Sequence, residues 1–243
     1  MLRNLTYFYA FAVFCLFTCK KTTDPVISTQ NINNKAAVIR KSKTDSLIKI
    51  ACEGTSLTYG EDIAGTDTTS EQPGFVNGPT RAEIQYPLSM ALALNNSKVF
   101  LSLRGYPGDR TTEGLTRWQD STSADICIIE YGTDDAYNFV GYASGPVPVN
   151  IYKSQLETIA LRRIKQGAWV ILCVPPYLES GDTRIAAYRS AAMSAAHELS
   201  LGYFDIETSV QQVPSPYSDV VHLNSKGYKA WGLNITSVVN VIN

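Results

Sequence analysis

The sequence has few histidines, no closely spaced cysteine pairs and no excess of charge of either sign. Only His197 and His222 occur among 243 residues, and no CxxC spacing is present, so a metal site built from histidine or cysteine is not expected. Lys and Arg number 21 against 22 Asp and Glu, and no basic run could follow a phosphate backbone. We therefore expect no metal, no cofactor and no nucleic-acid partner.

A membrane-spanning apolar run is also missing, because the longest candidate, from Leu5 to Thr18, is shorter than the roughly 20 residues that cross a bilayer. Arg3 precedes this run, which favours a signal peptide over residues 1–19. The run ends at Cys19 in a segment that resembles a bacterial lipobox, although Phe17 and Thr18 are larger than is usual there. A lipid anchor on Cys19, an ordinary signal peptide and an uncleaved anchor are the alternatives. Each predicts export to the cell envelope or beyond it, with membrane contact through this segment alone.

The polar stretch 20–46 is rich in Lys, Thr and Asn and lacks periodicity, so we expect a flexible tether. Residues 47–243 then form one domain. With 44% hydrophobic and 10% aromatic residues, the chain can bury one substantial core. We expect this domain to be a monomer.

The domain alternates short apolar runs with segments of helical periodicity. Such strands, apolar on both faces, are typical of a parallel sheet that helices cover on both sides. We predict a three-layer α/β/α sandwich around a mostly parallel, five-stranded sheet of flavodoxin-like type. The expected strands are 47–52, 98–103, 125–130, 168–174 and 202–206, and the expected helices are 86–95, 112–119, 150–166, 184–199 and 225–241.

Three cysteines, Cys52, Cys127 and Cys173, lie in the predicted strands. The simpler interpretation is that they are buried free thiols, which pack like small apolar side chains. A disulfide between Cys52 and Cys127, or between Cys127 and Cys173, is the alternative.

Residues that could take part in catalysis follow the predicted strands, at the strand ends where active sites of such sheets lie. Ser56 follows the first strand, Gly108 the second and Asp134 the third, while Asp219 and His222 precede the last helix. A serine hydroxyl becomes nucleophilic when a base accepts its proton and a carboxylate orients that base. Asp219 lies three residues before His222, within reach of its imidazole in a turn, and a glycine turn offers N–H groups to an oxyanion.

Each of these residues also has a purely structural interpretation. Ser56 could cap a helix, Asp219 and His222 could cap the last helix, and Gly108 could serve only a turn. His197 lies in an alanine-rich helical segment, where we expect a surface or packing role. The order of the blocks along the chain favours the functional interpretation.

That order resembles the SGNH family, also called the GDSL esterases and lipases, over about residues 47–243. The matching blocks are Gly54-Thr55-Ser56-Leu57, Gly108, Gly132-Thr133-Asp134-Asp135 and Asp219-Val220-Val221-His222. The GxSxG motif of the other large esterase class is absent around Ser56, since position 58 is Thr. The resemblance implies that Ser56 is the nucleophile, His222 the general base and acid, and Asp219 its orienting partner. It also implies an oxyanion hole made by the Ser56 and Gly108 N–H groups and the side chain at position 134.

Two positions depart from the family pattern. Thr55 replaces an aspartate, and Asp134 replaces the asparagine that donates to the oxyanion. An ionised carboxylate accepts hydrogen bonds and donates none, and the loss of one such donor costs about 3 kcal/mol. Asp134 could be protonated and donate, the two backbone donors could support a slower enzyme, or the protein could be a carbohydrate-binding module without turnover.

For the substrate we expect short acyl esters, chiefly acetyl esters on carbohydrates. Lysophospholipids and thioesters are the alternatives. The segment 59–80 should border the cleft, and Thr55, Tyr59, Asp135 and Tyr137 are the candidate substrate contacts. Core packing is the alternative role for Tyr137.

Overall fold

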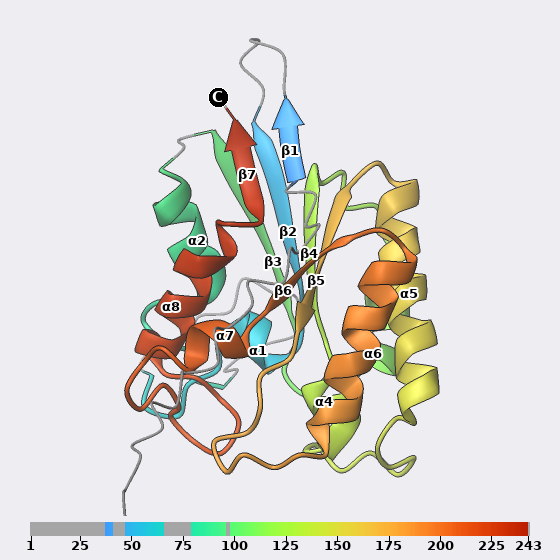
Figure 1. The fold of residues 1–243 in the computed structure, drawn as a ribbon, viewed down its shortest axis with the longest axis vertical. Coiled ribbons are helices and arrows are strands. Elements are labelled where there is room, and N and C mark those ends of the chain that lie inside the picture. Colours follow the sequence, from blue (N-terminus) through green and yellow to red (C-terminus); the bar gives the residue numbers. More distant parts are fainter. Residues whose placement is uncertain (1–36, 41–46, 66–78, 96–97, 243) are drawn as a thin grey trace, which may run out of the picture. The chain divides into compact units, whose positions relative to one another are not determined.

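The computed structural model of the chain describes residues 37–40, 47–65, 79–95 and 98–242 (Figure 1). The predicted signal peptide and lipobox lie outside these ranges, as does the predicted tether apart from residues 37–40. The strands of the main sheet are β2 (Ile48–Gly54), β3 (Val99–Gly105), β4 (Ile126–Glu130), β5 (Trp169–Val174) and β6 (Gly202–Asp205). All five were predicted from the sequence, with ends that differ by a few residues.

The main sheet has the strand order β3-β2-β4-β5-β6, and every neighbouring pair is parallel. This is the flavodoxin-like order, in which ligands bind beyond the carboxyl ends of the strands where the winding direction reverses. The reversal occurs at β2, which lies between β3 and β4. The loops that follow these three strands are therefore neighbours at one edge of the sheet.

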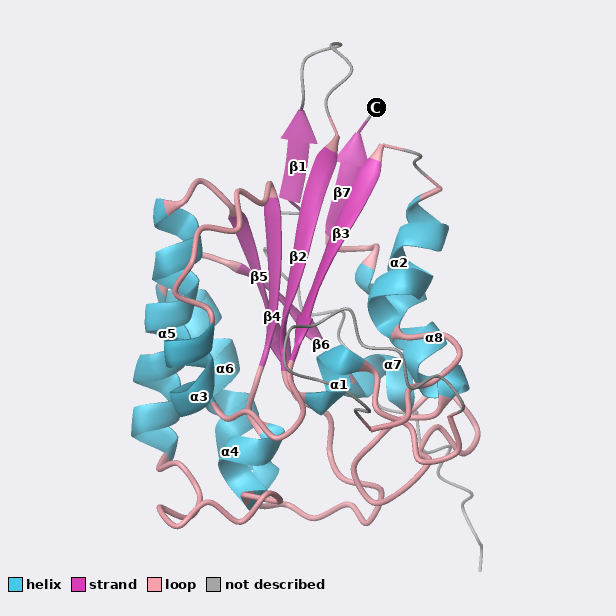
Figure 2. Cartoon of the chain, turned by 180° about the vertical axis from the view of Figure 1, so that it is seen from behind, coloured by secondary structure: helices cyan, strands magenta, loops and turns pink. Residues whose placement is uncertain are grey.

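Helices cover both faces of the sheet, as the alternating pattern predicted (Figures 1 and 2). Helices α2 and α8 pack together on one face, and α5 and α6 pack on the other, with α3 beside α5. Short helices α1, α4 and α7 follow strand ends. The helices are α1 (Ser56–Tyr59), α2 (Tyr86–Leu94), α3 (Thr111–Arg117), α4 (Thr133–Tyr137), α5 (Val149–Lys165), α6 (Ile185–Glu198), α7 (Glu207–Val210) and α8 (Ser225–Ile235).

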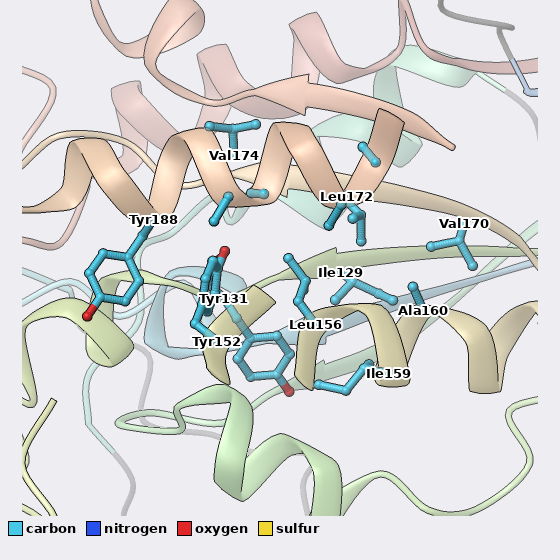
Figure 3. Close-up of a cluster of buried hydrophobic side chains, with 14 of the residues drawn as sticks. Ile129, Tyr131, Tyr152, Leu156, Ile159, Ala160, Val170, Leu172, Val174 and Tyr188 are labelled. Atoms are coloured by element: carbon cyan, nitrogen blue, oxygen red, sulfur yellow. The ribbon is translucent and has the colours of Figure 1, made fainter. Parts of the chain in front are cut away.

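The core divides into two clusters because successive strand residues point to opposite faces. In β5, Val170, Leu172 and Val174 face α5 and α6, whereas Ile171 faces the α2–α8 side. Figure 3 shows the first cluster, in which side chains of β4 and β5 pack against those of α5. Burial of apolar side chains specifies the register of the strands, and with it the position of each loop at the strand end.

The same alternation decides the state of the cysteines. Cys52, Cys127 and Cys173 are buried and free. Cys127 lies in the cluster against α5, whereas Cys52 and Cys173 lie in the cluster against α8. A disulfide requires Cβ atoms that face each other, so both pairings that involve Cys127 are excluded.

The end of the last helix was predicted wrongly. The expected helix 225–241 ends at Ile235, and a turn leads into strand β7 (Val239–Ile242). This strand pairs in parallel with β1 (Ala37–Arg40), which lies inside the range predicted as a tether. Three of the four residues of β7 are β-branched, which favours a strand once a partner is available. Among the described residues, no helix is long and apolar enough to cross a membrane.

Candidate active site

Ser56 is the first residue of α1, two residues after the end of the interior strand β2. Thr55 caps this helix, because its side chain accepts a hydrogen bond from the N–H of Leu57. The N–H groups in a first helical turn have no partner within the helix, so the Ser56 N–H can serve an anion. Gly60 ends the helix with φ of 85°, and a Cβ there would meet Gln85 at 2.2 Å. The tight turn that presents Ser56 therefore requires glycine at position 60.

The turn before α8 holds a carboxylate and an imidazole together. Asp219 Oδ1 accepts hydrogen bonds from the N–H of Val221 at 2.8 Å and of His222 at 2.7 Å. Asn224 caps α8 by accepting from the N–H of Lys226, and its amide donates to the backbone of the loop. Asp219 Oδ2 is left to face the histidine ring.

Ser56, His222 and Asp219 form a continuous hydrogen-bonded chain. His222 Nδ1 lies 2.7 Å from Asp219 Oδ2, and His222 Nε2 lies 2.9 Å from Ser56 Oγ. A carboxylate on Nδ1 keeps the proton on that nitrogen, which leaves Nε2 free to accept the serine proton. The structure thus brings together three residues that are up to 166 positions apart in sequence.

The charge of Asp219 suits this arrangement. Burial disfavours its ionised form, but hydrogen bonds from His222 and Val221 outweigh burial and hold the pKa of Asp219 below its ordinary value. The group therefore remains a carboxylate at neutral pH. An ionised partner on Nδ1 stabilises the imidazolium that forms when Nε2 takes a proton.

Glu61 adds a second carboxyl group beside the same histidine. Its Oε2 lies 3.6 Å from His222 Nε2, the nitrogen that faces Ser56. Burial raises the pKa of Glu61, His222 opposes that shift, and the negative charge of Asp219 adds to it. Glu61 was not among the residues predicted from the sequence, although it lies five residues after Ser56 in the segment expected to border the cleft.

The buried side chain of Glu130 holds the turn that carries Ser56. Glu130 Oε2 accepts hydrogen bonds from the Thr55 N–H at 3.2 Å, the Thr55 hydroxyl at 2.9 Å and the Thr58 hydroxyl at 3.1 Å. Burial raises the pKa of Glu130, and these hydrogen bonds oppose the shift. The contact explains the departure at position 55, since a threonine can donate to Glu130 where an aspartate would place a second negative charge. Glu130 was not predicted from the sequence, although a charged residue at the end of an apolar strand is a signal that could have identified it.

The segment that carries Gly108 is anchored at two points. Arg117 donates to both carboxylate oxygens of Asp109, at 2.6 and 2.8 Å. The N–H and hydroxyl of Thr111 donate to Asp135, at 3.0 and 2.5 Å. Gly108 has φ of 78°, in the left-handed region that favours glycine. These contacts fix the Gly108 loop beside the loop that follows β4.

Asp134 lies in that neighbouring loop, in the first turn of α4, and only 5% of its surface is exposed. Burial, followed by the negative charges of Glu130, Asp135 and Glu61, raises the pKa of Asp134 well above its ordinary value. No hydrogen bond occupies its carboxyl group within the described part of the chain. The arrangement favours a neutral carboxylic acid, which can donate a hydrogen bond as an amide does.

Three of the four residues expected to contact the substrate are buried inside the protein. Thr55 and Asp135 are fully buried, and Tyr59 is 3% exposed with its hydroxyl bonded to the Pro79 carbonyl. These three residues leave little surface for a substrate, so their role is to support the site. Tyr137 is partly exposed, stacks on Phe139 at 5.3 Å and donates to the Asp182 carbonyl. His197 is exposed on α6, as expected.

A cleft of about 500 Å³ borders the turn that carries the histidine. Tyr177, Glu207 and Tyr217 line it, and the Tyr217 hydroxyl donates to the Tyr177 carbonyl at 2.6 Å. Ser56 and His222 are not among the residues that line this cleft.

Solved structures similar to this chain share its fold at low sequence identity. A lipase/acylhydrolase from Enterococcus faecalis is 22% identical with a TM-score of 0.61, covering 79% of this chain and 95% of its own. A catalytic mutant of an acetylxylan esterase from Geobacillus stearothermophilus is 17% identical with a TM-score of 0.62, covering 81% and 96%. An aryl esterase from M. smegmatis is 16% identical with a TM-score of 0.58, covering 79% and 100%.

Comparison with curated proteins found no match. The model of the GDSL-like lipase/acylhydrolase family, by contrast, matches residues 52–230, which is well over half of the chain. The matched range contains all of the blocks described above. Together with the α/β fold of the similar structures, this match shows that the chain belongs to the GDSL-like lipase/acylhydrolase family of ester hydrolases.

Proposed function

We propose that this protein hydrolyses carboxylic esters with Ser56 as nucleophile, His222 as general base and Asp219 as the residue that orients the imidazole. The observation that carries the proposal is the unbroken chain from Asp219 Oδ2 to His222 and on to Ser56 Oγ, at 2.7 and 2.9 Å. Serine, histidine and carboxylate in this geometry are the groups that acyl transfer needs. A binding module without turnover would not require this geometry.

In the first step Ser56 Oγ attacks the ester carbonyl while His222 Nε2 takes the hydroxyl proton. The resulting oxyanion receives hydrogen bonds from the N–H groups of Ser56 and Gly108 and from the protonated carboxyl of Asp134. His222 then gives its proton to the departing alcohol oxygen, which leaves an acyl-serine. Water deprotonated by His222 attacks that acyl group and releases the acid, and the proton returns to Ser56.

We further propose that the acyl group is short, chiefly acetyl, and that the alcohol is a carbohydrate. Acetylxylan esterases among the similar structures support this choice, although at 17% identity they share the fold alone. The burial of the residues around Ser56 also supports a small acyl group. Lysophospholipids and thioesters remain the competing substrates, and the substrate panel below separates them.

A fluorophosphonate probe tests the nucleophile directly, because it labels a serine that a neighbouring base activates. We expect labelling of the wild-type protein, loss of labelling in Ser56→Ala, and normal labelling in the control Ser190→Ala, an exposed serine on α6. A panel of acetyl, long-chain and thioesters then identifies the acyl and alcohol classes by product release. Folded wild-type protein that is neither labelled nor active on any ester would overturn the proposal.

We also propose export through residues 1–19, with a lipid on Cys19 or free release after cleavage. The support is the sequence itself, namely the short apolar run after Arg3 and the cysteine at its end. Metabolic labelling with palmitate in a bacterial host should mark the wild-type protein and not Cys19→Ser. Cys15→Ser, four residues earlier in the same run, is the matched control.

A further inference from the structure

The Glu61 carboxylate lies beside the histidine nitrogen that must protonate the departing alcohol of an ester. Its Oε2 is 3.6 Å from His222 Nε2, and this same nitrogen is 2.9 Å from Ser56 Oγ. To donate a proton to the departing alcohol, Nε2 must come within hydrogen-bonding distance, about 3 Å, of that alcohol's oxygen. A second oxygen on the neighbouring carbon of the alcohol then comes within reach of Glu61.

The backbone of Glu61 is fixed, so the position of its side chain is not incidental. Its N–H donates to the Ser56 carbonyl at 3.0 Å, and its carbonyl accepts from the Tyr228 hydroxyl at 2.9 Å. Glu61 also forms an antiparallel bridge with Arg81. These contacts tie Glu61 to the serine turn on one side and to α8, the helix that follows His222, on the other.

The carboxylate of Glu61 has unused acceptor capacity. In the described part of the chain, His222 is its only ion-pair or hydrogen-bond partner, and 20% of its side chain is exposed. A carboxylate offers about four acceptor positions, and one long contact with an imidazole leaves most of them open. Two other acids interact with this carboxylate electrostatically, since the negative charge of Asp219 raises the pKa of Glu61, and that of Glu61 raises the pKa of Asp134.

We propose that Glu61 determines specificity for the alcohol, in that its carboxylate accepts a hydrogen bond from a hydroxyl next to the scissile ester oxygen. The inference rests on the proposed esterase function and extends it to the substrate class. Esters of polyhydroxy alcohols satisfy the free acceptor. Esters whose alcohol carries a phosphate or carboxylate bring a negative charge toward Glu61 and are disfavoured.

Two esters with the same carbon skeleton test this role. Glycerol 1-acetate has a hydroxyl next to the ester oxygen, and propyl acetate lacks it. The measured quantity is the ratio of the two kcat/KM values, which a change in folding or in the basicity of the histidine leaves alone. A hydrogen bond to a charged group corresponds to roughly ten- to a hundredfold, so Glu61→Leu should lower this ratio by about that factor.

Glu61→Gln replaces the carboxylate by a neutral acceptor of the same shape, so this variant should retain part of the preference for glycerol 1-acetate over propyl acetate. The third substrate is 1-acetylglycerol 3-phosphate. Glu61→Gln should raise the ratio of its kcat/KM to that of propyl acetate by at least about threefold over the wild type, because the repulsion between the phosphate and the Glu61 carboxylate is removed. The control is Glu157→Gln, a carboxylate on α5 paired with Lys153, which should leave all three ratios unchanged.

Equal loss on glycerol acetate and propyl acetate in Glu61→Leu would overturn the inference, because Glu61 would then act through His222 and not through the alcohol. A wild-type enzyme that prefers the phosphorylated ester would overturn it as well. Hydrolysis of 4-nitrophenyl acetate by the wild type and not by Ser56→Ala separates this failure from failure of the proposed function. A wild type inactive on every ester would refute both.

Discussion

Asp134 decides how the oxyanion is held, and its replacement by asparagine gives a sharp test. Asp134 is 5% exposed, and burial together with the neighbouring acids raises the pKa of its carboxyl group well above the ordinary value. While it is protonated, it donates a hydrogen bond much as asparagine does. Asp134→Asn should therefore have nearly the wild-type kcat/KM at mildly acidic pH.

The two enzymes should separate as the pH rises through the pKa of Asp134. Ionisation removes one oxyanion donor, worth about 3 kcal/mol or roughly a hundredfold in rate, and adds a repulsive charge. The wild type should therefore lose activity on the alkaline side, whereas Asp134→Asn should keep it. On the acid side, where Asp134 is protonated and can donate, the two profiles should coincide.

The assay is the pH dependence of kcat/KM for 4-nitrophenyl acetate, corrected for spontaneous hydrolysis. Asp134→Ala removes the donor at every pH and should be about a hundredfold slower than Asp134→Asn throughout. Glu157→Gln, which removes a carboxylate far from the serine, should follow the wild-type profile. Identical profiles for the wild type and Asp134→Asn, or a large fall in Asp134→Asn at all pH values, would refute the role of Asp134 as a donor.

Three further outcomes follow from the contacts around the site. Asp219→Asn should lower kcat/KM on the order of 10⁴-fold. Two backbone N–H groups hold one oxygen of this side chain, so the amide NH₂ of the variant would face His222 Nδ1 and force the imidazole proton onto Nε2. Thr55→Val should lower the free energy of unfolding by about 1–3 kcal/mol in urea titrations, since it leaves the buried Glu130 carboxyl group short of a donor. The same change at Thr158, an exposed residue of α5, should cost little. Burial raises the pKa of Asp135 from 3.8 to about 7, so the stability that its neutral form supplies should be lost as pH rises from about 4 to about 7. Asp135→Asn should remove that part of the pH dependence, at most roughly 4 kcal/mol in calorimetric unfolding.

Each of these outcomes has a clear contrary result. Activity of Asp219→Asn within tenfold of the wild type would mean that this carboxylate does not set the tautomer. Equal costs for Thr55→Val and Thr158→Val would mean that the buried contact with Glu130 contributes no more than a surface hydroxyl. An unchanged slope of stability against pH in Asp135→Asn would place the titrating proton on another acid.

The sequence alone determined the local elements and the chemical blocks. Apolar runs identified all five strands of the main sheet, because strands covered by helices on both faces are apolar at most of their positions. The blocks around Ser56, Gly108, Asp134 and His222 could be placed because glycine, serine and Asp-x-x-His stand directly after or before those elements. Even the anomaly at position 134 was visible, since residue type decides whether a side chain can donate.

Only the tertiary structure decided which groups meet. Strand order places the loops after β2, β3 and β4 side by side, and no local pattern specifies that order. In the sequence Glu61 is an acidic residue of a loop like any other. Its approach to within 3.6 Å of His222 depends on a contact between residues 161 positions apart. The same holds for β7, whose strand form depends on pairing with distant β1. Protonation of Asp134 is likewise a property of the fold, because burial and neighbouring charges, and not residue type, set the pKa of a carboxyl group.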